Sequence, residues 1–558
     1  MKKVITFLLL LWVIMPAQLS AQFTKDSSYI SVLRYSDFAT VKISNSYKKQ
    51  NDHTFIISIS SDGKYFVTVS KKVFSDTYHY TFYESNTGKI LKTEKTKSIL
   101  DFIFIGDKML TLNNYKGLSM TDITTNTPKW NHKLFNGKPF YLHGDILLSI
   151  DKENEDQIQG LNLSNCSMWT VSIPHNSGIR TIQKIDEDNL LIVADKLVKL
   201  DTKTGKMKSL KIKNYIPNGK KITGNILLGV LAVAANVASA YTTGYIFIPI
   251  FKENHEGFLS TVYPESTTIA RLSSNLLQAD SLFYFADRNN VFCFDTDLNV
   301  QWSTPLPPKS GSSSFLHLQN DTLWMVNCGL ATINSTRTGQ FGSPFYAAFN
   351  AHSGSQLMLQ VMGKKQDDLH SVVNNTNHVS YLFKDTCKTF YFDTQETIIN
   401  AGENRFKDFR LIEEAYCLNA ETHKFVPLDS CLVYAHNMKN GDIYQVSRTD
   451  SLTHLYAPGC VYFDNGQFAD SLRVIYNRQA NEKFDCWIID AQGNPALHIE
   501  EAIESMTVTN DYLFFIHDKD YFSILHKAGL KPEPAPQPKK KEQPEPQESQ
   551  LLNERPNS

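Results

Sequence analysis

The sequence predicts an all-β chain that folds into a single β-propeller of about eight four-stranded blades. One turn pattern recurs through most of the chain: an acidic or amide residue closes a strand, a small polar residue and Gly or Asn form the turn, and an aromatic residue follows in the next strand. The first four copies, at Glu84, Asp122, Asn162 and Asp201, are 38, 40 and 39 residues apart. That spacing matches the period of about 40 residues that is typical of propeller blades. With 42% hydrophobic and 12% aromatic residues, the chain can fill the core of such a ring.

Residues 1–21 are predicted to be a secretory signal peptide. Two lysines form its basic start, Val4–Met15 its apolar core, and Leu19-Ser20-Ala21 a small-residue cleavage site. The first cysteine is Cys166, far from that site, so we do not expect a lipoprotein anchor. The sequence therefore predicts an exported protein that is periplasmic, outer-membrane-associated or extracellular.

The first blade is predicted directly from alternating apolar and β-branched residues. Strands are expected at Thr54–Ser60, Tyr65–Val69 and Tyr78–Glu84, with a fourth that begins at Lys89. The turn Ser61–Lys64 contains Asp-Gly, in which Gly supplies the positive φ that a tight hairpin requires.

Later copies of the turn, at Asp295, Asn350, Asn419 and Asp490, are 94, 55, 69 and 71 residues from the copy before. We expect insertions in these blades, or one repeat that has decayed. Tryptophans follow the turn in three copies: Trp130, Trp169 and Trp302.

The last repeat, from Met506 to Leu525, lacks a fourth strand in the sequence pattern. Propellers often close by letting an N-terminal strand complete the last blade, which removes an open sheet edge. Residues 28–46 could supply that strand. We therefore assign 22–530 to the propeller and 531–558 to a disordered tail rich in Pro, Lys and Glu.

An apolar insertion at 214–258 interrupts the repeats. Residues 222–251 form a stretch of 30 positions without a charge, long enough to cross a bilayer as a helix. A single crossing would place the first four blades and the remaining blades on opposite sides of a membrane. Three interpretations remain: packing against the propeller or a partner, a hairpin or helical pair that dips into a membrane, or a true span.

The eight cysteines show no C-x-x-C spacing, so neither a zinc site nor a redox centre is indicated. Cys293 and Cys417 lie two residues before the acidic or amide position of the turn, where Ala348 stands in another copy. We interpret both as small buried hydrophobic residues. Other disulfide pairings stay open.

The turns resemble a known family. The pattern A-x-D-x-x-T-G-x-x-x-W is the tryptophan-docking motif of the quinoprotein alcohol dehydrogenase-like propellers, also called PQQ-like repeats. Ala348–Gly354 and Asp122–Trp130 are most similar to it, and the resemblance covers roughly residues 50–530. The hairpin at Ser61–Lys64 is equally similar to WD40 repeats. The resemblance implies a propeller fold and a secreted bacterial protein.

Catalytic residues of that family are not carried over. A working quinoprotein dehydrogenase would be expected to have a vicinal disulfide and calcium ligands, and no Cys-Cys pair or C-x-x-C-H motif occurs in the sequence. We predict no catalytic residue, no cofactor site and no metal site. His79, His370 and His436 are interpreted as strand or loop residues. The acidic run Asp151–Asp156 is either a solvated hairpin tip or, less favoured, a calcium loop without EF-hand spacing.

Three hypotheses for function follow. The leading one is a non-enzymatic envelope or secreted propeller that acts as a protein-interaction scaffold, with an envelope protein as partner. It resembles the role of outer-membrane assembly propellers with PQQ-like repeats, which is an analogy of fold. The alternatives are a carbohydrate-binding or hydrolytic enzyme that uses the axial funnel, and a membrane-inserting protein that uses 222–251. The net charge of −1 gives no reason to expect nucleic acid.

Overall fold

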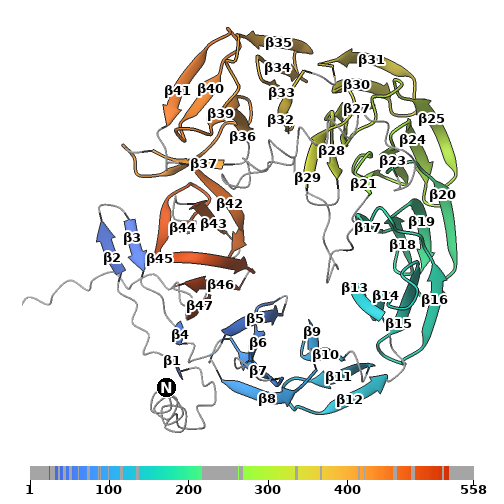
Figure 1. Cartoon of the computed structure of the whole chain (residues 1–558), viewed down its shortest axis with the longest axis vertical. Helices are drawn as coiled ribbons and strands as arrows, with labels where there is room; N and C mark the ends of the chain where they lie inside the picture. Colours follow the sequence, from blue (N-terminus) through green and yellow to red (C-terminus); the bar gives the residue numbers. More distant parts are fainter. Residues whose placement is uncertain are drawn as a thin grey trace, which may run out of the picture.

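The structure is a computed structural model. Its described residues run from 53 to 526, apart from 217–261, 263–267 and other interruptions of at most five residues, together with the backbones of four strands between residues 24 and 48. The predicted signal peptide, most of the apolar insertion and the predicted tail lie outside the described residues. The described part of the chain contains strands and no helices. The strands form sheets that are arranged as a ring. Within each blade the strands lie side by side, from an innermost strand to one at the outer rim (Figure 1).

The first half of the ring consists of regular blades with their strands in sequence order. Blade 1 is β5–β8 (His53–Ile59, Tyr65–Lys71, Tyr78–Glu84, Ile90–Thr96), and blade 2 is β9–β12 (Leu100–Ile105, Lys108–Asn113, Gly117–Asp122, Pro128–His132). Blade 3 is β13–β16 (Gly137–His143, Ile146–Asp151, Gln157–Asn162, Met168–Ser172), and blade 4 is β17–β20 (Thr181–Lys184, Asn189–Val193, Lys196–Asp201, Met207–Lys211). Blade 5 is β22–β25 (Leu277–Ala279, Leu282–Ala286, Asn290–Asp295, Val300–Pro305).

Blades 6 to 8 keep four antiparallel strands, and blades 6 and 8 each carry an added hairpin. Blade 6 is β26, β27, β30 and β31 (Ser314–Gln319, Thr322–Asn327, Phe345–Asn350, Gln356–Val361). The hairpin β28–β29 (Leu330–Ile333, Arg337–Gln340) leaves it and pairs with β21 (Ile269–Ala270). Blade 7 is β32–β35 (Leu369–Asn374, His378–Phe383, Thr386–Tyr391, Glu396–Ala401). Blade 8 is β36, β39, β40 and β41 (Phe409–Ile412, Val433–Asn437, Ile443–Val446, Leu452–Tyr456).

The ring ends in one composite sheet of twelve strands. Its strand β45 (Pro495–Val508) is 14 residues long and serves two blades. The first part of β45 pairs with β44, as in Trp487↔His498, and the last part pairs with β46, as in Thr507↔Phe514. Blade 9 is therefore β42–β45 (Val461–Phe468, Leu472–Arg478, Phe484–Ile489, Pro495–Val508), and blade 10 continues with β46 and β47 (Tyr512–His517, Tyr521–His526).

The N-terminal segment supplies the missing strand of the last blade. Strand β4 (Ser46–Lys48) pairs antiparallel with β47, and β1 (Thr24–Lys25) pairs with β4. The closing strand thus begins at the last residue of the predicted range 28–46. Within that range, β2 and β3 (Val32–Tyr35, Phe38–Val41) form a hairpin, and β3 lies parallel to β45 at Thr40↔His498.

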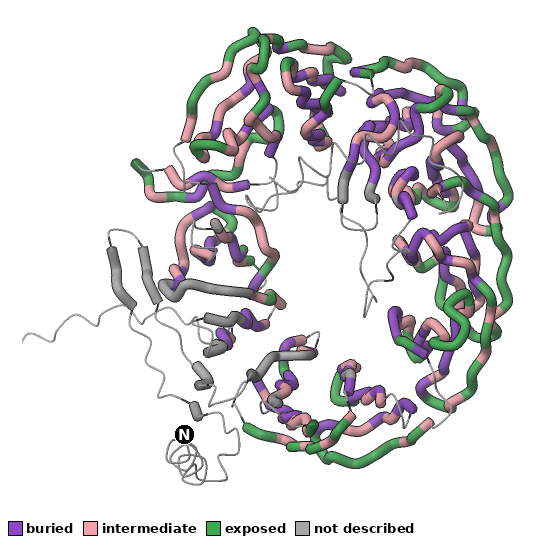
Figure 2. Tube along the Cα trace, viewed as in Figure 1, coloured by how far each residue is buried: buried purple, intermediate pink, exposed green. Residues whose placement is uncertain are grey.

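The hydrophobic core is divided among the junctions between blades. In the described part of the chain, a buried apolar cluster fills each junction between neighbouring blades, including that between blades 10 and 1. At this last junction Phe66 stacks on Tyr83 with 4.7 Å between ring centroids and meets Phe514 at 6.1 Å. Buried residues lie along the inner strands, and exposed residues follow the outer rim (Figure 2). The ring is therefore closed by packing as well as by β4.

The prediction of about eight blades was wrong: the sheets amount to about ten. Seven of the eight turns counted in the sequence lie between the third and fourth strands of blades 1–6 and 9, whereas Asn419 lies in the extra hairpin β37–β38 (Ala415–Leu418, Phe425–Pro427). Blades 7 and 8 have Tyr391 and Ser447 at the position of the acidic residue, so the turn pattern does not identify them. Blade 10 has no such turn because its fourth strand comes from the N-terminus.

Candidate functional site

The recurrent turn binds a tryptophan from the preceding blade. The indole Nε1 of Trp130 donates to the carbonyl oxygen of Leu163 at 2.9 Å, and that of Trp169 donates to Thr202 O at 2.8 Å. Trp302 repeats the contact with Ala351 O at 2.9 Å. In each case the acceptor directly follows the acidic or amide residue of the next blade. The predicted tryptophan-docking motif is therefore a physical contact in this structure.

Gly205 shows why this position of the motif favours glycine. Its φ is +71°, and a Cβ atom added there would lie 2.7 Å from the Trp169 ring. The same ring lies 2.1 Å from where a Cβ of Gly160 would be, so the indole is held between two glycines. The acidic residue organises the turn, because Asp201 Oδ1 accepts the backbone N–H groups of Lys203 at 3.0 Å and Thr204 at 2.9 Å.

The two cysteines of the motif lie where the sequence placed them. Cys293 pairs with Trp302 across the strands, and the exposures of Cys293 and Cys417 are 1% and 0%. Burial raises the pKa of the Cys293 thiol to about 11, so it is not a nucleophile at neutral pH. All seven cysteines in the described residues are free thiols.

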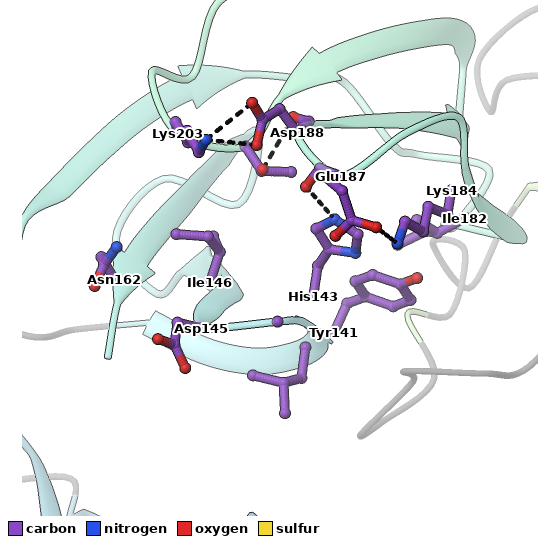
Figure 3. Close-up of a pocket in the computed structure, with 13 residues that line it drawn as sticks. Tyr141, His143, Asp145, Ile146, Asn162, Ile182, Lys184, Glu187, Asp188 and Lys203 are labelled. Carbon is purple, nitrogen blue, oxygen red and sulfur yellow. Dashed lines mark hydrogen bonds and ion pairs between the residues drawn. The ribbon is translucent and has the colours of Figure 1, made fainter. Parts of the chain in front are cut away.

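A groove of about 650 Å³ lies beside the tryptophan-docked junction of blades 3 and 4 (Figure 3). Blade 3 contributes the β13–β14 turn, and blade 4 contributes the β17–β18 turn and the turn that receives Trp169. The groove is lined by Tyr141, Leu142, His143, Gly144, Asp145, Ile146, Asn162, Ile182, Lys184, Glu187, Asp188, Thr202 and Lys203.

One hydrogen bond joins the two sides of the groove, and two ion pairs lie on the blade 4 side. His143 Nε2 lies 3.0 Å from the carbonyl oxygen of Glu187, which joins blade 3 to blade 4. Lys184 Nζ is 2.5 Å from Glu187 Oε1, and Lys203 Nζ is 2.7 Å from Asp188 Oδ1. The hydrogen bond from Lys203 to Asp188 raises the pKa of Lys203. The basic groups in the groove are therefore already paired.

Asp145 differs from the other two carboxylates of the groove. Its Oδ2 accepts a hydrogen bond from Ser164 Oγ at 2.5 Å, and no ion pair to it occurs among the described residues. The groove thus presents paired charges, one further carboxylate and an apolar floor. Neither serine nor cysteine lines the groove.

The root of the apolar insertion is the second candidate surface. Ile216, the last described residue before the uncharged stretch 222–251, pairs antiparallel with Ile269, with N–O distances of 3.1 and 3.4 Å. Val262 pairs with Ile179, whose backbone N–H donates to Val262 O at 3.2 Å. Ile216 also packs on a small cluster that contains Ile269 and Ala331. The chain on both sides of the uncharged stretch is thus attached to the ring, at the β21–β28–β29 sheet through Ile216 and at the junction of blades 3 and 4 through Val262.

A buried carboxylate reinforces this root. Asp195 is 8% exposed and accepts hydrogen bonds from the backbone and side chain of Ser177, both at 2.8 Å. It also accepts from Asn176 Nδ2 at 2.8 Å and from Tyr215 Oη at 3.1 Å. Tyr215 directly precedes Ile216, so this network positions the chain where it leaves blade 4.

The remaining predicted residues lie in ordinary strands and turns. Asp151 Oδ1 accepts the backbone N–H groups of Glu153 at 2.8 Å and Asn154 at 3.1 Å, which makes the acidic run a hairpin tip. His79, His370 and His436 are strand residues, as predicted. No group of His, Cys, Asp or Glu in the described residues has the geometry of a metal site. No helix that could span a membrane occurs among them either, and 222–251 lies outside them.

The groove was not predicted from the sequence. His143 and Glu187 are 44 residues apart and belong to different blades, so no local motif links them. The available signal was the repeat itself, since turns one period apart become neighbours in a ring.

Comparisons with known proteins identify no family. No protein-family model and no curated protein matches the sequence. Among solved structures, BamB from Moraxella catarrhalis aligns over 91% of this chain and 99% of its own, with 12% identity and a TM-score of 0.29. AztD from Citrobacter koseri aligns over 69% and 93%, with 9% identity and a TM-score of 0.28. The computationally designed Ika8 protein aligns over 66% and 98%, with 12% identity and a TM-score of 0.25.

Proposed function

We propose that this protein is a non-enzymatic, exported propeller that uses its apolar insertion to bind an envelope protein. The observation that carries the proposal is that Ile216 and Val262 are each held to the ring, by pairing with Ile269 and with Ile179. Between them lies the stretch 222–251, which contains no charged residue. The ring is thus a rigid frame that presents an uncharged segment of the chain at a defined place.

The geometry of the root argues against a single membrane crossing. The hydrocarbon core of a bilayer is about 30 Å thick, and a chain that crosses it once must end on the opposite side. Here residues on both sides of the insertion are hydrogen-bonded to each other and to the same blades. The blades before and after the insertion also share the buried cluster of Leu191, Phe283 and Phe294. The residues that flank the segment therefore belong to one and the same ring.

Composition favours a protein partner over solvent for this segment. An uncharged stretch of this length exposed to water is unfavourable, and contiguous apolar surface of this kind usually marks a contact with another molecule. The predicted signal peptide places that contact outside the cytoplasm.

The proposal is tested by replacing 222–251 with a short Gly-Ser linker in a tagged chain. Native cells are crosslinked, the tagged protein is captured, and its partners are identified by mass spectrometry. We expect one stoichiometric envelope protein with the intact chain and its loss with the replacement. A matched control shortens the exposed hairpin tip Lys152–Glu155 and should retain the partner.

Two results would contradict the proposal. One is the recovery of the same partner with the replaced segment, provided that the variant unfolds as cooperatively as the intact chain. The other is carbonate-resistant membrane association that depends on 222–251 while no partner is captured, which would favour insertion into lipid.

A further inference from the structure

A second candidate site lies away from the groove, in blades 7 and 8. It centres on Arg410, in β36, which lies on the inside of the ring in blade 8 beside β32 of blade 7 (Figure 1). Arg410 faces His436 across the β36–β39 pair, and its Nη1 donates to the carbonyl oxygen of His370 at 3.1 Å. The guanidinium thus bridges the inner strands of two blades.

Arg410 is a half-buried arginine whose guanidinium has few partners in the described part of the chain. A guanidinium carries five N–H donors, and the contact with His370 O uses one of them. No carboxylate of the described residues forms an ion pair with it. By contrast Arg405, in the connection that leads to β36, binds Asp450 Oδ1 at 2.6 Å and Asp450 O at 3.2 Å. Burial alone lowers the pKa of Arg410.

The nearby acidic residues do not compensate this charge. Asp368 and Asp408 are close enough to affect the pKa of His370, but neither pairs with Arg410. Asp408 is already bound to Lys439 Nζ at 2.8 Å. Burying a charge without a partner is costly, and a charge-assisted hydrogen bond to an oxyanion offsets that cost.

We propose that Arg410 binds an oxyanion group, a carboxylate or a phosphate, of a molecule that reaches the inside of the ring. The planar fork of the guanidinium suits two parallel hydrogen bonds to such a group. His370 and His436 flank it, and burial lowers the pKa of both imidazoles, so at neutral pH the arginine supplies the positive charge. The proposal does not rest on the proposed function.

The test measures the thermal unfolding of the mature chain against inorganic phosphate and, separately, acetate, with chloride added to keep the ionic strength constant. We expect a saturable rise in Tm with at least one of the two anions. Arg410→Gln should weaken the apparent affinity by about tenfold or more, the equivalent of one charge-assisted hydrogen bond. Lys407→Gln, which removes an exposed charge three residues away, should leave it unchanged.

The two anions separate the sources of the ligand: a response to phosphate alone indicates a phosphorylated ligand, and a response to acetate alone indicates a carboxylate. Equal responses of the intact chain and Arg410→Gln, or no saturable response of the intact chain, would overturn the proposal. If Arg410→Gln does not fold, Arg410→Lys keeps the charge without the fork. It should bind more weakly than arginine in isothermal titration with the same anion, and equal affinity would also overturn the assignment.

Discussion

Blades 2–6 and blades 8–10 are joined to their neighbouring blades in different ways. In the first arc, tryptophans from blades 2, 3 and 5 dock on the turns of the following blades, and each acceptor lies at the same position of its turn. In the second arc no tryptophan docks on a turn in this manner within the described residues. Instead β45 is shared by two blades, and β37–β38 and β4 are added from elsewhere in the chain. Repetition therefore builds the first arc through local contacts, and long-range strand exchange builds the second.

The cluster around Trp487 shows the difference most clearly. Trp487 stacks on His498 with 3.9 Å between ring centroids, and both side chains contact Asp485. His498 Nε2 lies 2.7 Å from Asp485 Oδ1, and Tyr462 Oη donates to Asp485 Oδ2 at 2.7 Å. This network lowers the pKa of Asp485 even though burial alone would raise it. An aromatic and ionic cluster thus takes the place of the docked indole.

The largest effect is expected for Trp169→Ala. The substitution removes the indole from between Gly160 and Gly205 and the hydrogen bond to Thr202 O, leaving a cavity beside the groove. We expect a loss of about 3–5 kcal/mol in the free energy of unfolding, measured by urea denaturation. Trp487→Ala is the counterpart in the second arc and should cost less, since its indole Nε1 lies 3.4 Å from its acceptor. Equal losses would remove the distinction between the arcs.

The junction of blades 6 and 7 should be sensitive to acid. His317 packs among aromatic rings, with Phe392 at 4.7 Å, and burial lowers its pKa from 6.5 to about 4. Between pH 4 and 6.5 the unfolded chain therefore binds more protons at this histidine than the folded chain does. The free energy of unfolding is highest above about pH 6.5 and falls as the pH drops towards 4. Over this range His317 should lower the free energy of unfolding by about 3 kcal/mol. His317→Phe should flatten the dependence of the unfolding free energy on pH; an unchanged slope would contradict the assignment.

Removing residues 22–48 tests the closure of the second arc. The deletion takes away β4 and its three register pairs with β47, which then becomes an open edge. We expect a loss of about 2–3 kcal/mol, from about 1 kcal/mol per lost strand pair, and concentration-dependent association. Light scattering and thermal unfolding measure the two effects. Deleting 531–558 is the matched control and should change neither.

The smallest effect comes from the turn glycines. Gly205→Ala combines an unfavourable φ of +71° with a contact 2.7 Å from the Trp169 ring, and should cost about 2–3 kcal/mol. Gly144→Ala is the control, because its φ is +53° and no atom lies within 4 Å of the added Cβ. It should cost about 1 kcal/mol. Similar losses in urea denaturation would show that backbone strain, rather than tryptophan docking, explains the requirement for glycine.

Sequence periodicity predicted the first arc well because its determinants are local. Asp201 and Gly205 lie within one turn, and the strands on either side pair directly. The same reasoning failed at blades 7 and 8, where Tyr391 and Ser447 occupy the acidic position although the strands still form blades. It also assigned Asn419 to a blade, whereas this residue makes the same turn in an added hairpin. A turn pattern reports a turn, and it does not report which sheet the flanking strands join.

The sequence by itself determined the all-β class, the tryptophan-docking turns, the buried cysteines and the interruption by an uncharged segment. Each depends on residues that are close in the chain, where strand alternation and turn hydrogen bonds decide the conformation. Only the tertiary structure decided the number of blades and the participation of β45 in two of them. The same holds for the pairing of Ile216 with Ile269 and for the place of Arg410 beside the carbonyl oxygen of His370. These features depend on contacts between residues that are distant in the chain. Such contacts form only when the ring closes, because burial of apolar surface between blades, and not local preference, selects the partners.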